Sequence, residues 1–160
     1  MKRTFALLAL AFITAAHAAP PANELAGTWT LVSVENVHPD GTIAEPYGKN
    51  PDGTLMFDAS GRYALMIFRA GRARFAATDK NRGTAEENAE TVRGTNTHFG
   101  RYAVDGTNLI FKIDHASFPN WEGTEQRRAF TLDGDVLRYT VTTTTSGGPE
   151  IARVTWKRLK

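Results

Sequence analysis

Apolar and β-branched residues gather in eight short runs of this chain, and in most runs they alternate with polar residues. Such alternation is typical of strands whose side chains point in turn to a buried and to an exposed face. None of the runs contains a proline, which would remove a hydrogen bond from a central strand. The predicted strands cover residues 27–35, 54–57, 62–69, 98–104, 108–115, 125–132, 136–144 and 151–157.

The connections between these runs are of two kinds, which follow one another along the chain. Tight turns built on Asp and Gly occupy residues 58–61, 105–107 and 133–135, and long connections occupy 37–53, 70–96, 116–124 and 144–150. In an up-and-down array, successive connections lie at opposite ends. The pattern therefore predicts an all-β fold, an eight-stranded up-and-down antiparallel barrel with tight turns at one end and an open mouth at the other.

One short helix is expected in the second long connection. Thr84 and Glu87 have the spacing of a capping box, and Gly94 is a typical helix stop. We place this helix near residues 84–94.

The first residues have the pattern of an export signal. Lys2 and Arg3 precede an apolar run over 5–13 and a small-x-small cleavage site at 16–18. We expect residues 1–18 to be cleaved, 19–24 to form a tail and 25–160 to form the barrel, so that the protein is periplasmic or secreted. No apolar run reaches the length of a membrane-spanning helix.

Composition argues against several classes of partner and cofactor. Without Lys2 and Arg3 the 19 basic residues become 17, equal to the 17 acidic ones, and no dense basic run suggests nucleic acid binding. There is no cysteine, and His38, His98 and His115 lack the spacing of metal ligands. No serine-nucleophile, phosphate or dinucleotide motif occurs, so we expect neither a metal nor a cofactor.

The first strand opens with Gly27-x-Trp29, which resembles the lipocalin signature. That resemblance implies that Trp29 closes the narrow base and that a late-strand arginine, Arg158 or Arg153, covers it. More specific motifs follow along the chain: Gly27-Thr28-Trp29-x-Leu31-Val32-Ser33, Asp52-Gly53-x-Leu55, Phe99-Gly100-x-Tyr102, Phe118-Pro119-Asn120-Trp121-x-Gly123-Thr124 and the run from Gln126 to Leu137. With them, residues 25–158 resemble the lipocalin-like domain family, which implies a small barrel with an interior cavity and no single established reaction.

Strand alternation also predicts which side chains enter the barrel. On strand 108–115 the apolar phase contains Leu109, Phe111 and Ile113, and its next position is His115. On strand 125–132 the same argument gives Leu132 and Phe130, followed by polar positions toward the mouth. We therefore expect a polar group inside the open end and an apolar base, with Tyr102 and Tyr139 adding hydroxyls. The polar group consists of His115, Gln126 and Arg128. For strand 62–69 the sequence does not decide which face points inward, because both faces of this strand are apolar.

Each candidate binding residue also has a structural interpretation. His115 is either a proton carrier or a buried imidazole paired with Gln126 or a loop carbonyl. Arg128 either anchors a carbonyl or carboxylate group or pairs with a nearby acidic residue. Asn120 and Trp121 either close over a ligand or pack a corner of the rim.

Three hypotheses of function follow. The first is an exported protein that binds a small, mainly apolar or amphipathic molecule, with its polar end near the mouth. The second is an isomerase or cyclase that uses the same cavity, with His115 moving a proton beside Arg128. The third is an interaction module whose 70–96 segment docks a protein partner.

Overall fold

The computed structural model describes residues 22–143 and 150–160. The expected signal segment, residues 19–21 of the expected tail and residues 144–149 of the last long connection lie outside the described residues. Nine strands, three 3-10 helices and one α-helix are found in the described part. The strands are β1 (Gly27–Val37), β2 (Ile43–Ala44), β3 (Asp52–Phe57), β4 (Arg62–Phe68), β5 (Thr95–Asp105), β6 (Asn108–Ala116), β7 (Glu125–Asp133), β8 (Val136–Val141) and β9 (Ile151–Arg158); the helices are η1 (Ala22–Leu25), η2 (Lys80–Arg82), α1 (Ala85–Arg93) and η3 (Pro119–Trp121).

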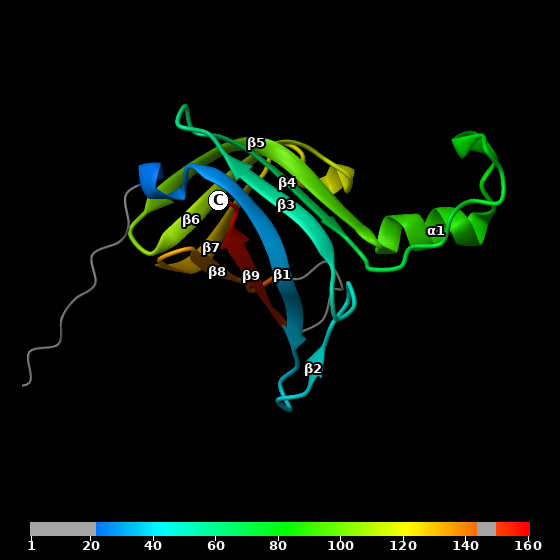
Figure 1. Cartoon of the computed structure of the whole chain (residues 1–160), viewed down its shortest axis with the longest axis horizontal. Coiled ribbons are helices and arrows are strands. Elements are labelled where there is room, and N and C mark those ends of the chain that lie inside the picture. Colours follow the sequence, from blue (N-terminus) through cyan, green and yellow to red (C-terminus); the bar gives the residue numbers. More distant parts are fainter. Residues whose placement is uncertain (1–21, 144–149) are drawn as a thin grey trace, which may run out of the picture.

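Eight of these strands form a closed antiparallel barrel (Figure 1). Neighbours in the sheet follow the chain from β3 to β9, and β1 pairs with both β3 and β9, which closes the ring. Strand β2 is a two-residue addition at the end of β1. The predicted eight-stranded up-and-down barrel is therefore confirmed, and β2 is the strand that alternation did not predict.

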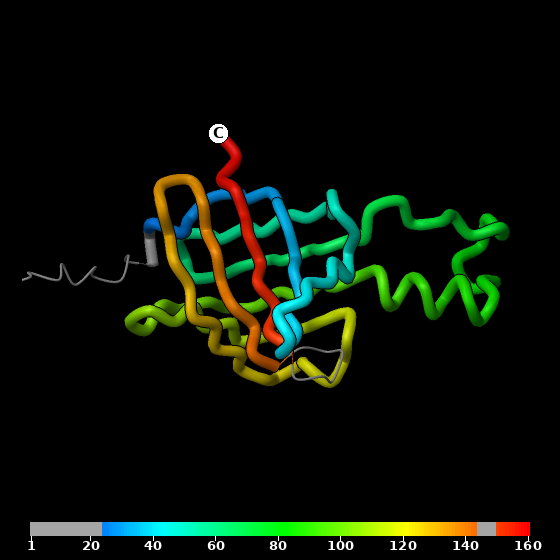
Figure 2. The backbone as a smooth tube through the Cα atoms, turned by 90° about the horizontal axis from the view of Figure 1, so that it is seen from below, coloured from blue at the N-terminus to red at the C-terminus, as the bar shows by residue number. Residues whose placement is uncertain are grey.

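The predicted helix is also confirmed, as α1. The Thr84 hydroxyl accepts a hydrogen bond from the amide of Glu87 at 3.2 Å, and the Glu87 carboxylate accepts one from the amide of Thr84 at 2.7 Å. This is the capping box expected from the sequence. Helix α1 and the segment before it extend away from the barrel (Figures 1 and 2). None of the nine helical residues is buried. No helix in the described ranges has the length and apolar content to cross a membrane.

The narrow end is closed around Trp29, which is fully buried. Its indole N–H donates to the Leu25 carbonyl at 3.0 Å, and the Arg158 guanidinium lies 4.1 Å from the centre of its ring. Arg158 also donates to the Ala26 carbonyl at 2.7 Å and to the Glu24 carbonyl. Gly27 adopts φ 130°, and a Cβ there would approach Arg158 to 3.0 Å. Arg158, and not Arg153, thus covers the tryptophan.

Inward side chains follow the predicted alternation on most strands. On β7 and β8 the side chains of Phe130, Leu137 and Tyr139 are buried, as expected. The sequence did not decide which face of β4 points into the barrel. In the structure, Tyr63, Leu65 and Ile67 point inward. The core is thus continuous from the plugged base upward.

Candidate functional site

A cavity of about 570 Å³ opens at the end of the barrel that carries the long connections. Its volume lies within the range of roughly 300–1,000 Å³ that is usual for small-molecule sites. Most of its wall area is aliphatic or aromatic, and polar side chains, among them three arginines, lie between the apolar ones. The lining residues that matter below are Leu65, Ile67, Trp121, Gln126, Arg128 and Tyr139.

Arg128 is the buried charged group of this cavity, whereas Arg69 and Arg93 lie at its mouth. The residue is 5% exposed, and its Nη2 donates to the Gln126 amide oxygen at 2.6 Å. Its guanidinium carbon lies 4.7 Å from the centre of the Phe111 ring and 4.8 Å from that of Tyr139. None of the ion pairs between described residues includes Arg128. The sequence predicted that Arg128 either anchors a carbonyl or carboxylate group or pairs with an acidic residue. Such a pair is not found among the described residues.

A buried histidine lies beside this arginine. His98 is 2% exposed, and its Nδ1 is 2.7 Å from the Tyr63 hydroxyl. Its ring packs against those of Phe111 and Trp121. Burial, and secondarily the charge of Arg128, lowers the pKa of His98 to about 3. The imidazole is therefore neutral at neutral pH.

The two tyrosines of this region stay protonated. Burial raises the pKa of Tyr63, and it also raises the pKa of Tyr139, while the nearby Arg128 acts in the opposite direction on both. Their hydroxyls are therefore available as hydrogen-bond donors. Arg128 is consequently the one charged member of a group that also contains Tyr63, His98 and Tyr139.

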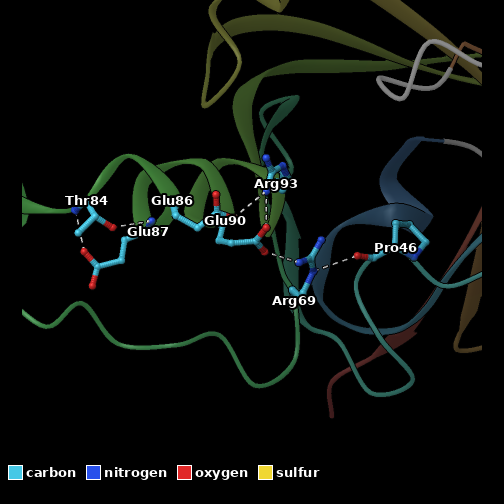
Figure 3. A network of polar contacts seen from close by, with 7 residues as sticks. All are labelled: Pro46, Arg69, Thr84, Glu86, Glu87, Glu90 and Arg93. Carbon is cyan, nitrogen blue, oxygen red and sulfur yellow. Dashed lines mark hydrogen bonds and ion pairs between the residues drawn. The ribbon is translucent and has the colours of Figure 1, made fainter.

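A polar network joins α1 to the rim of the cavity (Figure 3). Arg69, at the end of β4, donates to the Glu90 carboxylate at 2.9 Å and to the Pro46 carbonyl at 3.2 Å. Glu90 also pairs with Arg93, which lies 3.4 Å from Glu86. The last turn of α1 is thus fixed to the barrel, and Arg69, Arg93 and Pro46 all line the mouth.

The prediction that His115 points into the cavity is wrong. Phe99 pairs with His115, but Gly100 pairs with Ile113, so that Asp114 is an extra residue in β6. This β-bulge reverses the alternation after Ile113. The His115 side chain is 67% exposed and lies 3.4 Å from the Glu122 carboxylate. It therefore does not contact the cavity, and the enzyme hypothesis loses its proposed proton carrier.

The other predicted binding residues fall into two groups. Trp121, Gln126, Arg128 and Tyr139 line the cavity. The prediction is wrong for Tyr102, whose hydroxyl donates to the Asp58 carbonyl at the opposite, tight-turn end. Two more residues do not line the cavity: Phe111, which is fully buried in the core beneath it, and Asn120, which is exposed on η3.

His98 is the interior residue that the sequence argument did not select. A signal for it was present, because His98 shares the phase of Gly100 and Tyr102 on the same predicted strand. Its hydrogen-bond partner Tyr63 lies on strand 62–69, for which the sequence did not decide the inward face. Both assignments follow once the register between β4 and β5 is known, where Leu65 pairs with His98 and Tyr63 with Gly100.

In the described ranges, no group of three or more His, Asp or Glu side chains has an arrangement that could hold a metal ion. The cavity offers aromatic and aliphatic contacts, the buried guanidinium of Arg128, several hydroxyl groups and three side-chain amides, while Arg69 and Arg93 lie at its mouth; the amides are those of Asn36, Asn96 and Gln126. Such groups can contact an apolar surface and donate hydrogen bonds to oxygen atoms.

Comparison with known proteins places the chain in a family. The model of the lipocalin-like domain matches residues 26–159. The chain belongs to the lipocalin-like domain family. This lipocalin-like domain is 27% identical over 106 residues to a 4'-hydroxy-3'-methoxypropiophenone carrier protein of Aspergillus oryzae, which covers 60% of this chain and 96% of that protein.

A solved structure is also similar to the lipocalin-like domain. The crystal structure of a lipocalin-like protein from Bacteroides uniformis is 15% identical and matches with a TM-score of 0.46, covering 85% of this chain and 99% of that one.

Proposed function

We propose that this protein is exported and carries a small, mainly apolar molecule in its barrel, with the polar end of the molecule bound by Arg128 and Gln126. The observation that carries the proposal is a cavity of about 570 Å³ with apolar walls and one buried guanidinium. Apolar contact supplies most of the affinity, at about 25 cal/mol per Å² of buried surface, and the few polar groups orient the molecule.

The similarity to a carrier protein supports the same function. That relative is named for a phenolic aromatic ketone, which combines a flat apolar body with oxygen atoms at its ends. Trp121 and the aliphatic walls suit the body of such a molecule, and Arg128 suits an oxygen. We propose an aromatic molecule of this general kind as the ligand of the present chain.

Filling the cavity is expected to abolish binding of 4'-hydroxy-3'-methoxypropiophenone, measured by titration calorimetry. Ile67 lines the cavity and is 3% exposed, so that Ile67→Trp places an indole in the space of the ligand. We expect at least a roughly tenfold loss of affinity, because the apolar contact area is lost.

Met66→Trp is the matched control, since Met66 is the adjacent residue on β4 and does not line the cavity. This variant is expected to bind as the unmodified protein does. The proposal fails if the unmodified protein binds no aromatic ketone and yields no small molecule in native mass spectrometry.

The export part of the proposal rests on Lys2, Arg3, the apolar run over 5–13 and the site at 16–18. Expression of the full chain in a Gram-negative host is expected to yield a periplasmic protein that begins at Ala19, as read by N-terminal sequencing. An intact Met1 in the cytoplasmic fraction would contradict export and leave the binding proposal unaffected.

A further inference from the structure

Three buried polar atoms lie around the ring of Phe111 and lack a hydrogen bond of good geometry: Nε2 of His98, Nε of Arg128 and the hydroxyl of Tyr139, toward which Arg128 and Trp156 direct their N–H groups. All three side chains contact that ring, the two aromatic ones at centroid distances of 5.7 Å for His98 and 6.1 Å for Tyr139. We name His98, Phe111, Arg128 and Tyr139 the inner polar cluster. Two of its members, Arg128 and Tyr139, also line the cavity.

The inner polar cluster has more hydrogen-bond donors than acceptors. A guanidinium carries five N–H donors and no acceptor, and the acceptor found for Arg128 in the described ranges is the Gln126 amide oxygen. The Tyr139 hydroxyl adds another donor. An unsatisfied donor in a buried position is costly, and a buried charge without a counter-charge costs more.

The charge of the cluster is likewise one-sided. Arginine is not deprotonated in proteins, and the His98 ring beside it is neutral. The described acidic side chains that form ion pairs do so elsewhere, at the outer surface or the rim, among them Asp105 and Glu125 with Arg127. The electrostatic potential at the floor of the cavity is therefore positive, in a place where low dielectric strengthens it.

We infer that the cavity binds its ligand as an oxyanion, and that the ligand class is a small aromatic weak acid, such as a phenol, whose ionised oxygen lies against Arg128 and Tyr139. This inference rests on the proposed carrier function and adds the charge state of the cargo to it. An inorganic anion fits poorly, because it would leave most of the roughly 570 Å³ cavity and its apolar walls without contact.

Two probes of nearly equal shape test this inference: 4-nitrophenol, which ionises and changes colour, and 4-nitroanisole, whose oxygen is methylated and cannot ionise. Binding is measured by calorimetry across the titration range of the phenol, and the ionisation of the bound phenol is read from its absorbance. We expect the phenolate to bind roughly tenfold or more tightly than the anisole, as a charge-assisted hydrogen bond predicts. The pKa of the bound phenol then falls by about one unit.

Variants assign the effect to one side chain. Arg128→Met is expected to remove the preference for the ionised probe, and Arg128→Lys to keep part of it. Arg127→Met is the matched control, because Arg127 is the next residue in the chain and its side chain is 54% exposed on the outer surface. If Arg128→Met does not fold, the comparison of the two probes on the unmodified protein still tests whether the ligand binds as an oxyanion.

Three other outcomes would each contradict a part of the proposal. Equal affinity for both probes, with the bound phenol neutral, would overturn the oxyanion inference and leave the apolar carrier intact. A preference for the ionised probe that survives Arg128→Met would overturn the assignment to Arg128. Absence of binding by both probes would contradict the carrier function, and the inference with it.

Discussion

Adding one methyl group at Gly100 is expected to lower the free energy of unfolding by about 3 kcal/mol. In the Gly100→Ala variant an ideal Cβ would lie 2.1 Å from the carbonyl oxygen of Lys112 and 2.8 Å from the amide nitrogen of Asp114. Both are backbone atoms of the bulged part of β6 and have no flexible end that can turn aside. Urea denaturation followed by circular dichroism measures the loss.

Gly106→Asn is the control for this experiment. Gly106 has φ 57° in a tight turn with open space around its Cβ position, and asparagine tolerates this conformation. We expect its unfolding free energy to change by no more than about 0.5 kcal/mol. Equal stability of Gly100→Ala and Gly106→Asn would mean that β5 does not approach the bulge as closely as described.

The second large effect is a dependence of stability on pH that originates at His98. The pKa of His98 is about 3 in the folded protein and near 6.5 in an unfolded chain. Between these values the unfolded state binds a proton that the folded state excludes, so that stability is full above pH 6.5 and falls as the pH is lowered. The slope is about 1.4 kcal/mol per pH unit, and the total loss is about 5 kcal/mol.

Comparison with a variant isolates this contribution from that of the carboxylates. His98→Gln keeps a hydrogen-bonding group near Tyr63 but does not titrate, so that its stability should change less between pH 7 and 4.5, by about 3 kcal/mol. His115→Gln, at the exposed histidine, should retain the steep dependence of the unmodified protein. Parallel curves for His98→Gln and the unmodified protein would show that His98 titrates normally and is not desolvated.

Alternation and turn chemistry were sufficient to predict the barrel. Inward and outward positions on β7 and β8 follow a strict period of two, since no irregularity interrupts them. The tight turns at 58–61, 105–107 and 133–135 join consecutive strands as expected. The helix was predictable because the capping box of Thr84 and Glu87 is a local motif.

The candidate site was less predictable, because it depends on pairing between strands. One extra residue in β6, Asp114, reverses the direction in which the His115 side chain points. In the sequence this bulge is indicated only by a glycine on the neighbouring strand, Gly100. The partnership of Tyr63 with His98 requires the register of β4 and β5. Likewise, the position of α1 at the mouth depends on Arg69 and its contacts with Glu90 and Pro46.

The attachment of α1 has a practical consequence for labelling the protein. The helix is held at its last turn by Arg69, and none of the residues along it is buried. A dye or a short inserted tag in the segment ahead of it, around η2, would therefore leave the barrel core untouched. Because the last turn of α1 borders the cavity, such a reporter would be connected to the entrance of the cavity through this one helix.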